Sequence, residues 1–379
     1  MQNREIAAIV LAAGYASRMG RLKPLLPLGG GTVVEHTIRA FQHAGINEII
    51  VVLGHRYGDI IPVLEKNHIA WVVNPQYEKG MMGSIRKGVE ALREDTRAFF
   101  IMPADIPLVR PSTIIHLIKK HSSNPSLVVY PAFKGQRGHP PLIPVYHREG
   151  ILRWTGTGGL RRYLGAREKA CMDVATTDSG VLMDMDTPRD YENILEKSKN
   201  MDIPTREEAL AFLMMHQGSN TGVIRHANVV ASVAVEIGTV LNRTGSCLDL
   251  RLIEAAGLLH DIAKGQESHA ERAASLATEE GFSKVADIVS VHMNIVPDPA
   301  GRIGEKEIVY LADKMVHGSE IVSLEKRLNQ KIVHFAGNLK AIESVSLRME
   351  NAIKIQRDIE NIIGKPMGDL FSQLKCAYK

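Results

Sequence analysis

The chain has 379 residues, of which 45% are hydrophobic and 23% are charged. This composition is typical of folded globular proteins and excludes disordered and collagen-like chains. The 46 basic and 42 acidic side chains leave a formal net charge of +4, and aromatic residues make up only 5%. We therefore expect no nucleic-acid partner, since such proteins are usually strongly basic or rich in aromatic residues. The length suggests two domains.

The cysteines and the apolar segments indicate in which cellular compartment the protein is expected. Cys171, Cys247 and Cys376 are odd in number and form no Cys-x-x-Cys pair, so neither a disulfide framework nor a cysteine zinc site is indicated. No apolar run approaches 18 residues, and the short run that begins at Ile6 is interpreted as a strand rather than a signal peptide. We expect a cytoplasmic protein without a membrane partner.

The first half of the chain alternates short β-branched runs with amphipathic stretches. The predicted strands are Ile6–Leu11, Glu48–Leu53, Ile69–Val73, Ala98–Met102 and Ser126–Tyr130, and helices are predicted over Val33–Ala44 and Ser84–Leu92. Strands that alternate with helices predict a doubly wound α/β sheet whose strands are mostly parallel.

The second half is predicted to be an all-α domain without strands. Its expected helices are Arg206–Met215, Ile224–Leu241, Leu250–Ala263, His269–Glu280, Ser283–His292, Glu305–Val316 and Leu339–Ile363. A polar segment closed by Pro204 separates the halves, and Thr205 with Glu208 matches a capping box. We place one domain over residues 1–200 and the other over 201–379.

A glycine-containing loop follows the first strand. Gly14 and Gly20 permit a tight path close to a ligand, and the free N–H groups of such a loop can bind phosphate oxygens. Arg18 and Lys23 add positive charge suited to a triphosphate. The loop is neither a Walker A motif nor the dinucleotide fingerprint. The alternative is an ordinary βα turn with solvated basic residues.

Acidic residues are expected at the ends of two strands. Asp105 follows a buried strand, where ligands of open α/β sheets bind, and its carboxylate is suited to Mg²⁺. Val181–Asp186 is predicted to be a second such strand, with Asp184 and Asp186 on one face. Asp186 is a candidate metal ligand, and the alternative is that it caps the helix that begins near Pro188.

Two further clusters are candidate substrate contacts. Gly83 and Ser84 lie where a helix is predicted to begin and could contact the base or ribose, the alternative being a simple N-cap by Ser84. Gly138 and His139 form an unusual cluster with two prolines, for which a substrate contact and a structural role are both open.

Six blocks, in order, carry a family resemblance: LAAGYASRMGRLKPLLPL, GMMGS, PADIPLV, GHPPL, GTGGLRR and DMDTPRDY. Over residues 5–195 the chain resembles the molybdopterin nucleotidyltransferase family, and within it most closely the molybdenum cofactor cytidylyltransferases. The resemblance implies a Rossmann-like, MobA-like nucleotidyltransferase domain. It also implies transfer of a nucleotidyl group from an NTP to the terminal phosphate of molybdopterin, with release of pyrophosphate.

The resemblance assigns roles by position. Ala13 and Gly14 would lie near the base, Arg18 and Lys23 would contact the triphosphate, and Asp105 would bind Mg²⁺, with Asp186 a second metal ligand or a substrate contact. We add Leu11, Ala12, Gly83 and Ser84 to the nucleotide site and Gly138 and His139 to the substrate site. The Leu-Ala-Ala-Gly form is similar to the cytidylyl branch, which favours CTP over other NTPs. The chain departs from many relatives at Pro103–Pro107 and at Gly156–Gly159, which bears on the acceptor pocket.

Histidines and aspartates recur among the apolar helices of the second half. They are His226, the pair His260 and Asp261, His269, His292 and Asp313. Imidazole and carboxylate together suit divalent transition metals. An adjacent His-Asp pair after an apolar helix is also costly to bury unless a ligand binds it. The pattern therefore predicts a metal site.

Over residues 205–330 this order is similar to the HD superfamily of metal-dependent phosphohydrolases, which implies a helical bundle. On that resemblance His226, His260, Asp261 and Asp313 would hold a first metal such as Mn or Fe. His269 and His292 would hold a second metal, bridged by Asp261. Lys264 would contact phosphate, the alternative being a solvated lysine.

The leading hypothesis is a bifunctional enzyme: a CTP-dependent molybdenum cofactor cytidylyltransferase joined to an HD phosphohydrolase acting on a nucleotide or phosphate ester. A molybdoenzyme or its chaperone would be a further partner. Two alternatives stay open. The acceptor could be a sugar or alditol phosphate, or the HD domain could sense nucleotides without turnover.

Overall fold

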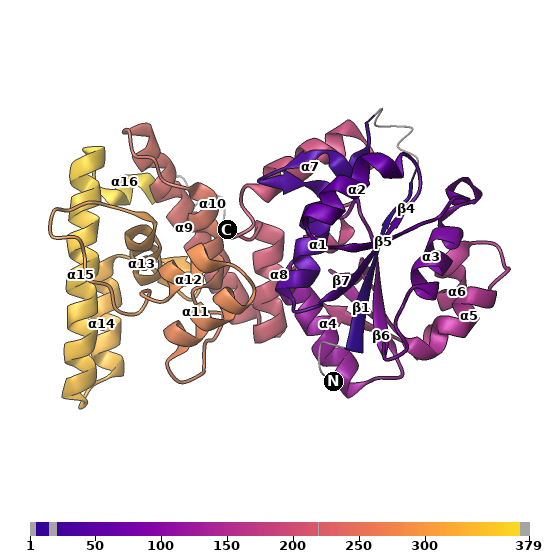
Figure 1. Cartoon of the computed structure of the whole chain (residues 1–379). Coiled ribbons are helices and arrows are strands. Elements are labelled where there is room, and N and C mark those ends of the chain that lie inside the picture. The colour runs from indigo at the N-terminus through magenta and orange to yellow at the C-terminus, as the bar shows by residue number, and fades with distance from the viewer. Residues whose placement is uncertain (1–4, 15–20, 219, 372–379) are drawn as a thin grey trace. The chain divides into compact units, whose positions relative to one another are not determined.

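The computed structural model describes residues 5–14, 21–218 and 220–371. The chain forms two compact units, Met1–Asn200 and Met201–Lys379 (Figure 1).

A mostly parallel sheet forms the centre of the N-terminal unit. Its strands are β1 (Ile6–Ala12), β4 (Glu48–Leu53), β5 (Ala70–Val73), β6 (Ala98–Pro103), β7 (Val128–Phe133), β8 (Gln136–Arg137), β9 (Leu142–Pro144) and β10 (Cys171–Ala175). They are ordered β10-β7-β9-β6-β1-β4-β5, with β8 paired to β7. Within this sheet, the antiparallel pairings among the described strands are those that involve β8 or β9.

Helices cover both faces of this sheet, which is why β1 is apolar and buried along its whole length. The helices are α1 (Val33–His43), α2 (Tyr57–Lys66), α3 (Met81–Glu90), α4 (Pro111–Ser123), α5 (Arg148–Arg153), α6 (Gly159–Gly165) and α7 (Pro188–Ser198). In Figure 1, α1 and α4 lie on one side of the sheet and α3, α5 and α6 on the other. A small hairpin, β2 (Pro27–Leu28) with β3 (Gly31–Thr32), precedes α1.

The predicted α/β fold is confirmed, with one wrong strand. Val181–Asp186 does not form a strand. A 3-10 helix, η6 (Ser179–Leu182), occupies its start, and the residues that follow are extended without pairing to the sheet. The edge position is instead taken by β10, which the β-branched pattern did not reveal. Asp186 is not the N-cap of α7 either, because the side chain of Thr187 accepts the hydrogen bond from Asp190 N.

A buried carboxylate anchors the segment that leads to Asp186. Asp178 is fully buried, and its Oδ2 accepts hydrogen bonds from the Arg110 backbone N at 2.7 Å and the Thr113 hydroxyl at 2.9 Å. Its Oδ1 accepts one from Gly180 N at 2.9 Å. The carboxylate thereby joins the start of α4 to η6. Asp178 was not among the predicted functional residues, and its contacts here are those of an anchor within the fold.

The C-terminal unit is helical, as predicted. Its helices are α8 (Arg206–Gln217), α9 (Thr221–Arg243), α10 (Leu250–Leu259), α11 (His269–Glu279), α12 (Ser283–Val289), α13 (Glu305–Met315), α14 (Leu324–His334), α15 (Leu339–Ile363) and α16 (Met367–Phe371). One core cluster runs from Ile203 to Phe371. By length and composition α9 could cross a membrane, but 61% of its most apolar window is buried, so its place in the core explains its apolarity.

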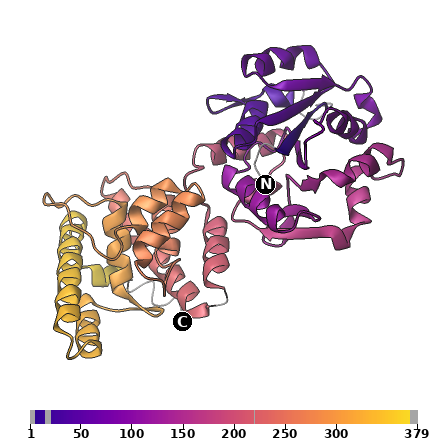
Figure 2. The same ribbon diagram turned by 60° about the horizontal axis from the view of Figure 1, so that its bottom comes forward.

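Some elements of this unit match the predictions and others were not predicted. The capping box before α8 is present, with Thr205 N donating to Glu208 Oε2 at 3.0 Å and Glu208 N donating to the Thr205 hydroxyl at 3.3 Å. A short hairpin, β11 (Val316–His317) with β12 (Glu320–Ile321), was not predicted, and neither was α14. Figures 1 and 2 show α14 and α15 side by side at one edge of the unit.

Replacing Asp178 by Ala should destabilise the N-terminal unit by about 3 kcal/mol or more, because three buried donors lose their acceptor. Both tryptophans, Trp71 and Trp154, lie in this unit, so urea unfolding of the full chain followed by tryptophan fluorescence reports on it. Asp95→Ala is the matched control, since that carboxylate is exposed. Equal unfolding midpoints for the two variants would contradict an anchoring role.

Candidate active sites

The first candidate site lies at the carboxyl end of the parallel strands. Asp105 follows β6 by two residues, and Lys23 begins the 3-10 helix η2 (Lys23–Leu25). The Lys23 Nζ donates to Asp186 Oδ1 at 2.9 Å and to Asp105 Oδ2 at 3.2 Å. Two backbone hydrogen bonds hold the segments in place: Ala104 N donates to Leu11 O, and Met185 N donates to Asp105 O. Three residues far apart in sequence thus meet at one edge.

The charges in this cluster support one another. Burial by itself would lower the pKa of Lys23, but the hydrogen bonds and charges of Asp186 and Asp105 outweigh it, and the pKa is raised. Lys23 is therefore firmly cationic at neutral pH. The side chain of Asp186 is 51% exposed and that of Asp105 is 28% exposed, so oxygens of both carboxylates stay accessible to a cation. Oxygen ligands of this kind suit Mg²⁺.

A cavity of about 300 Å³ adjoins the cluster. Its described lining residues are Leu11, Ala12, Ala13, Gly14, Lys23, Pro24, Tyr77, Gly80, Met81, Ser84, Pro103, Ala104 and Asp105. Most nucleotide-site candidates thus share one cavity. Gly83 is not among the described lining residues, and Arg18 and Gly20 lie outside the residues that the structure describes. Gly54 allows its backbone to approach the cavity lining closely, since a Cβ there would lie 2.7 Å from Ala13 O.

The start of α3 corrects one interpretation. The N-cap of this helix is Gly80, and Ser84 lies inside it, so the predicted alternative of an N-cap by Ser84 is wrong. The Ser84 hydroxyl accepts a hydrogen bond from Asn74 Nδ2 at 3.0 Å, and both side chains are buried. That contact ties α3 to the end of β5.

Gly138 and His139 lie beside the segment that leads to Asp186. His139 N donates to Val181 O at 2.9 Å, and a Cβ on Gly138 would lie 2.4 Å from the same oxygen, so this approach requires glycine. The His139 Nδ1 is buried and has no hydrogen-bond partner among the described residues. Burial lowers the pKa of His139, although the charges of Asp105 and Asp184 oppose that shift. His139 is thus neutral and electrostatically coupled to Asp105.

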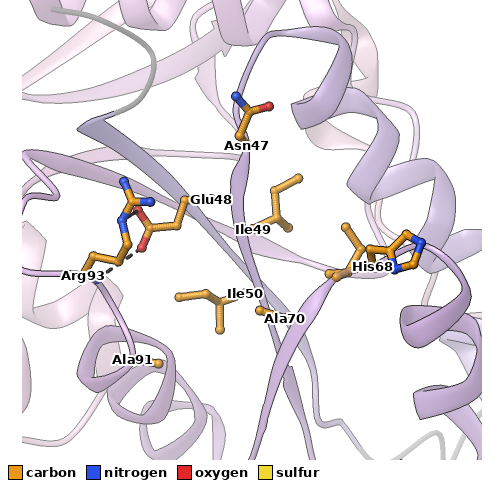
Figure 3. Close-up of a pocket in the computed structure, with 9 residues that line it drawn as sticks. Asn47, Glu48, Ile49, Ile50, His68, Ala70, Ala91 and Arg93 are labelled. Atoms are coloured by element: carbon orange, nitrogen blue, oxygen red, sulfur yellow. Dashed lines mark hydrogen bonds and ion pairs between the residues drawn. The ribbon is translucent and has the colours of Figure 1, made fainter.

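A larger hollow, of about 530 Å³, lies at the amino ends of β4 and β5 (Figure 3). Ile49, Ile50 and Ala70 line it together with Glu48 and Arg93. The two charged side chains form an ion pair at 3.3 Å and so neutralise one another. Because ligands of open α/β sheets bind at the opposite strand ends, this hollow is not the candidate nucleotide site.

The second candidate site is a cluster of imidazoles and carboxylates in the helical unit. His226 comes from α9, His260 and Asp261 from the turn after α10, and Asp313 from α13. The His226 Nε2 lies 3.2 Å from Asp313 Oδ1 and 3.9 Å from Asp261 Oδ2. The His260 Nε2 lies 3.5 Å from each of the same two oxygens. The four residues predicted to hold a first metal therefore converge.

The other oxygen of Asp261 faces two further histidines. Its Oδ1 lies 3.8 Å from His269 Nε2 and 3.9 Å from His292 Nε2, and the two imidazole nitrogens are 3.2 Å apart. Two groups of ligand atoms thus share Asp261, each within metal-binding range. This is the arrangement expected for a carboxylate that bridges two cations.

The backbone orients three of the imidazoles. The Nδ1 atoms of His226, His260 and His292 lie 3.0, 2.8 and 2.6 Å from the carbonyl oxygens of Gly318, Gly257 and Val289. When such an imidazole is neutral, its proton lies on Nδ1 and the Nε2 lone pair is free, which is the tautomer that metal-binding histidines use. The His260 Nε2 is buried and has no hydrogen-bond partner among the described residues. The residues present therefore fit a divalent transition metal.

Charge explains why the two aspartates stay ionised although they are buried. Burial by itself would raise the pKa of Asp261, but the charges of His260 and Lys264 lower it to about 2. The pKa of Asp313 is likewise held well below its usual value, mainly by Lys314. The Lys264 Nζ donates to Asp261 Oδ2 and the Lys314 Nζ to Asp313 Oδ2, each at 2.6 Å. Both carboxylates are therefore available as anionic ligands.

A cavity of about 890 Å³ opens beside this cluster. Lys264 lines it and is 49% exposed, so its ammonium is accessible from the cavity. His317 is exposed and also lines the cavity. The sequence prediction missed Arg327 and Lys331, which line the cavity from α14. Their four-residue spacing is the signal that could have found them, had α14 been recognised.

Comparisons with known proteins match each half of the chain to a known domain family. Residues 8–171 match the model of the MobA-like NTP transferase domain, and residues 223–317 match that of the HD domain. The molybdenum cofactor cytidylyltransferase of Escherichia coli (strain K12) is 27% identical over 194 residues, 51% of this chain and 96% of that protein.

Two further relatives resemble the N-terminal half. The probable molybdenum cofactor guanylyltransferase of Bacillus thuringiensis (strain Al Hakam) is 33% identical over 144 residues, 37% of this chain and 68% of that protein. The crystal structure of Rv0371c from Mycobacterium tuberculosis H37Rv is 25% identical, with a TM-score of 0.46, and covers 51% of this chain and 99% of that one.

We expect the helical unit to bind two divalent ions per chain, and Asp261→Ala to lose both because each ligand group uses that carboxylate. His269→Ala should lose only one of them. Elemental analysis of the Mn²⁺-loaded chain after gel filtration measures this, and His317→Ala is the control because it shares the cavity without belonging to either group. Unchanged metal content in Asp261→Ala would contradict the bridging role.

Proposed function

Because the chain belongs to the MobA-like NTP transferase family through its N-terminal half and carries an HD domain in its C-terminal half, we propose that it is a bifunctional cytoplasmic enzyme. Its first activity is transfer of a cytidylyl group from CTP to the terminal phosphate of molybdopterin, with release of pyrophosphate. Its second is metal-dependent hydrolysis of a nucleotide or another phosphate ester. A molybdoenzyme or its chaperone would receive the dinucleotide cofactor.

The cluster of Lys23, Asp105 and Asp186 carries the first proposal. Nucleotidyl transfer brings two anions together, so the main demands on a site are positioning and positive charge. Lys23 supplies a cation at the mouth of the cavity, and the carboxylates of Asp105 and Asp186 would hold Mg²⁺, which neutralises charge on the phosphates when bound. The acceptor phosphate is already ionised, so the reaction needs no general base.

The rest of this cavity suits a nucleoside. Ala13 and Gly14 border it beside the Lys23 cluster, and Ser84 contributes the end of α3. The similarity of Leu11–Gly14 to the cytidylyl branch and the relative from Escherichia coli favour CTP as the donor. Gly138 and His139 lie close to the carboxylates and are proposed to contact the acceptor.

The bridging position of Asp261 carries the second proposal. His226, His260, Asp261 and Asp313 would hold one metal, and His269, His292 and Asp261 a second. Bound ions of this kind lower the pKa of a water ligand and polarise a phosphoryl group. Lys264 contacts Asp261 and also lines the adjoining cavity. We assign it to binding of the substrate phosphate.

Incubation of the full chain with molybdopterin, Mg²⁺ and each NTP in turn should release pyrophosphate fastest with CTP. Lys23→Gln should slow this release by about 10²–10³-fold, the cost of removing one stabilising group from a charged transition state. Lys79→Gln is a control, since that exposed lysine is not among the lining residues of the cavity. Absence of pyrophosphate with every NTP would refute the transferase proposal, and faster release with GTP would refute the choice of donor.

Asp261→Ala should abolish hydrolysis of nucleotides and of p-nitrophenyl phosphate by the Mn²⁺-loaded chain, because both ligand groups lose a member. Pyrophosphate release by the transferase should be unchanged in the same preparation, and an unchanged helical circular dichroism spectrum shows that the helical unit is folded. If the unmodified chain binds nucleotide at the metal centre without turnover, the domain is a sensor and the hydrolase proposal fails.

A further inference from the structure

The wall of the HD cavity opposite the ligand helices is built by α14 and α15. Arg327 and Lys331 line the cavity from α14, and Arg348 does so from α15. These helices lie beyond residues 223–317, the stretch that matches the HD domain model. The binding surface that this wall provides therefore lies outside the part of the chain that matches the HD domain model.

Positive charge is in excess on this cavity. Of its described lining residues, Lys264, Lys314, Arg327, Lys331 and Arg348 are basic, and only Asp261 and Asp313 are acidic. Those two carboxylates already accept hydrogen bonds from Lys264 and Lys314. In the part of the chain that the structure describes, no carboxylate forms an ion pair with Arg327 or Lys331. Bound metal ions would increase the excess further.

These two cations, which have no carboxylate partner among the described residues, are partly buried, and the Lys331 Nζ lies 5.8 Å from the centroid of the Phe335 ring. Burial lowers the pKa of Arg327 and that of Lys331, and the charge of Arg327 lowers the latter further. Among the charged groups that affect Lys331 are Asp313, Lys314 and Lys264, which places it in the field of the metal-ligand cluster. Holding like charges together and partly dehydrated is costly unless an anion joins them.

The helix period explains how this wall arises. Arg327 and Lys331 of α14 and Phe335, the C-cap residue that follows this helix, are spaced four residues apart, so they lie on one side of the helix, and all three line the cavity. On the same helix Val333 is 76% exposed. An amphipathic helix usually buries its apolar face and exposes its charges. This part of α14 therefore turns charge inward, a pattern that suits an anionic ligand better than core packing.

We propose that the HD cavity takes an organic oligophosphate, such as a nucleoside di- or triphosphate, with one phosphoryl group at the metal ligands and the following ones on Arg327 and Lys331. The inference rests on the proposed hydrolase site but adds the class of substrate. A monophosphate would occupy the ligand cluster and Lys264 alone, leaving the basic wall without a partner. The cavity volume of about 890 Å³ is large enough for a nucleotide.

Apolar residues complete the fit. Val345 and Met349 of α15 and Phe335 of α14 line the same cavity as the cations. A purely inorganic chain of phosphates would make no use of these side chains, whereas the base or sugar of a nucleotide can pack on them. The organic part of the ligand is therefore assigned to this side of the cavity.

The binding test uses the metal-free full chain carrying Lys23→Gln, which weakens the competing triphosphate site of the N-terminal unit. Calorimetric titration with inorganic tripolyphosphate should give an affinity at least about tenfold higher than titration with orthophosphate. The double variant Arg327→Gln, Lys331→Gln should lose most of this difference. Lys326→Gln is the matched control, because it removes a charge from an exposed position of the same helix outside the cavity.

The hydrolysis test uses the Mn²⁺-loaded chain, again with Lys23→Gln. The double variant should lose about tenfold or more in kcat/KM for a nucleoside triphosphate while keeping its rate with p-nitrophenyl phosphate, which also reports that the variant is folded. Equal affinity for tripolyphosphate and orthophosphate, or a double variant that behaves like Lys326→Gln, would overturn the inference. Discrimination in binding without any hydrolysis would support the inference and refute only the proposed hydrolase activity.

Discussion

Every acidic residue assigned to the two candidate sites forms an ion pair with a lysine. Lys23 contacts Asp105 and Asp186, Lys264 contacts Asp261, and Lys314 contacts Asp313, all at 2.6–3.2 Å. In the helical unit, burial by itself would raise the pKa values of Asp261 and Asp313 and favour their protonated forms, which are poor ligands for a cation. The lysines thus stabilise negative charge on carboxylates that would bind a metal ion. This constraint links two units that otherwise share no structural principle.

The two units meet this requirement by different means. In the N-terminal unit, parallel strands end at one edge, and backbone hydrogen bonds from Ala104 and Met185 bring Asp105 and Asp186 to that edge. In the helical unit the ligands come from helices and turns, and backbone carbonyls fix the imidazole tautomers. The sheet therefore positions its site through strand topology, whereas the helical unit relies on single hydrogen bonds such as that from His226 to Gly318.

The sequence predicted the fold class and several of the side chains that lie together, but not every element that carries them. Asp105 was placed correctly because a strand end is recognisable from its buried run, and the histidine cluster was recognised from the order of its ligands. Asp186 reached the predicted region for the wrong reason, since its segment is held by Asp178 and Val181 rather than by a strand. The antiparallel strand Leu142–Pro144 is too short for a periodic signal. Arg327 and Lys331 were missed because α14 was not recognised, although Leu324, Leu328 and Ile332 recur there at helical spacing.

The separation of the cores decides how far the two activities can be dissected. The core of the helical unit runs from Ile203 to Phe371, and the described core cluster of the sheet unit that includes Ile9 and Val52 draws on residues from Ala7 to Cys171. Neither cluster includes a residue of the other unit. A substitution that disturbs packing in one unit therefore leaves the contacts that position the other site intact, because those contacts lie within its own core and its own backbone hydrogen bonds. Loss of both activities from a single change in either cluster would require communication that these cores do not provide.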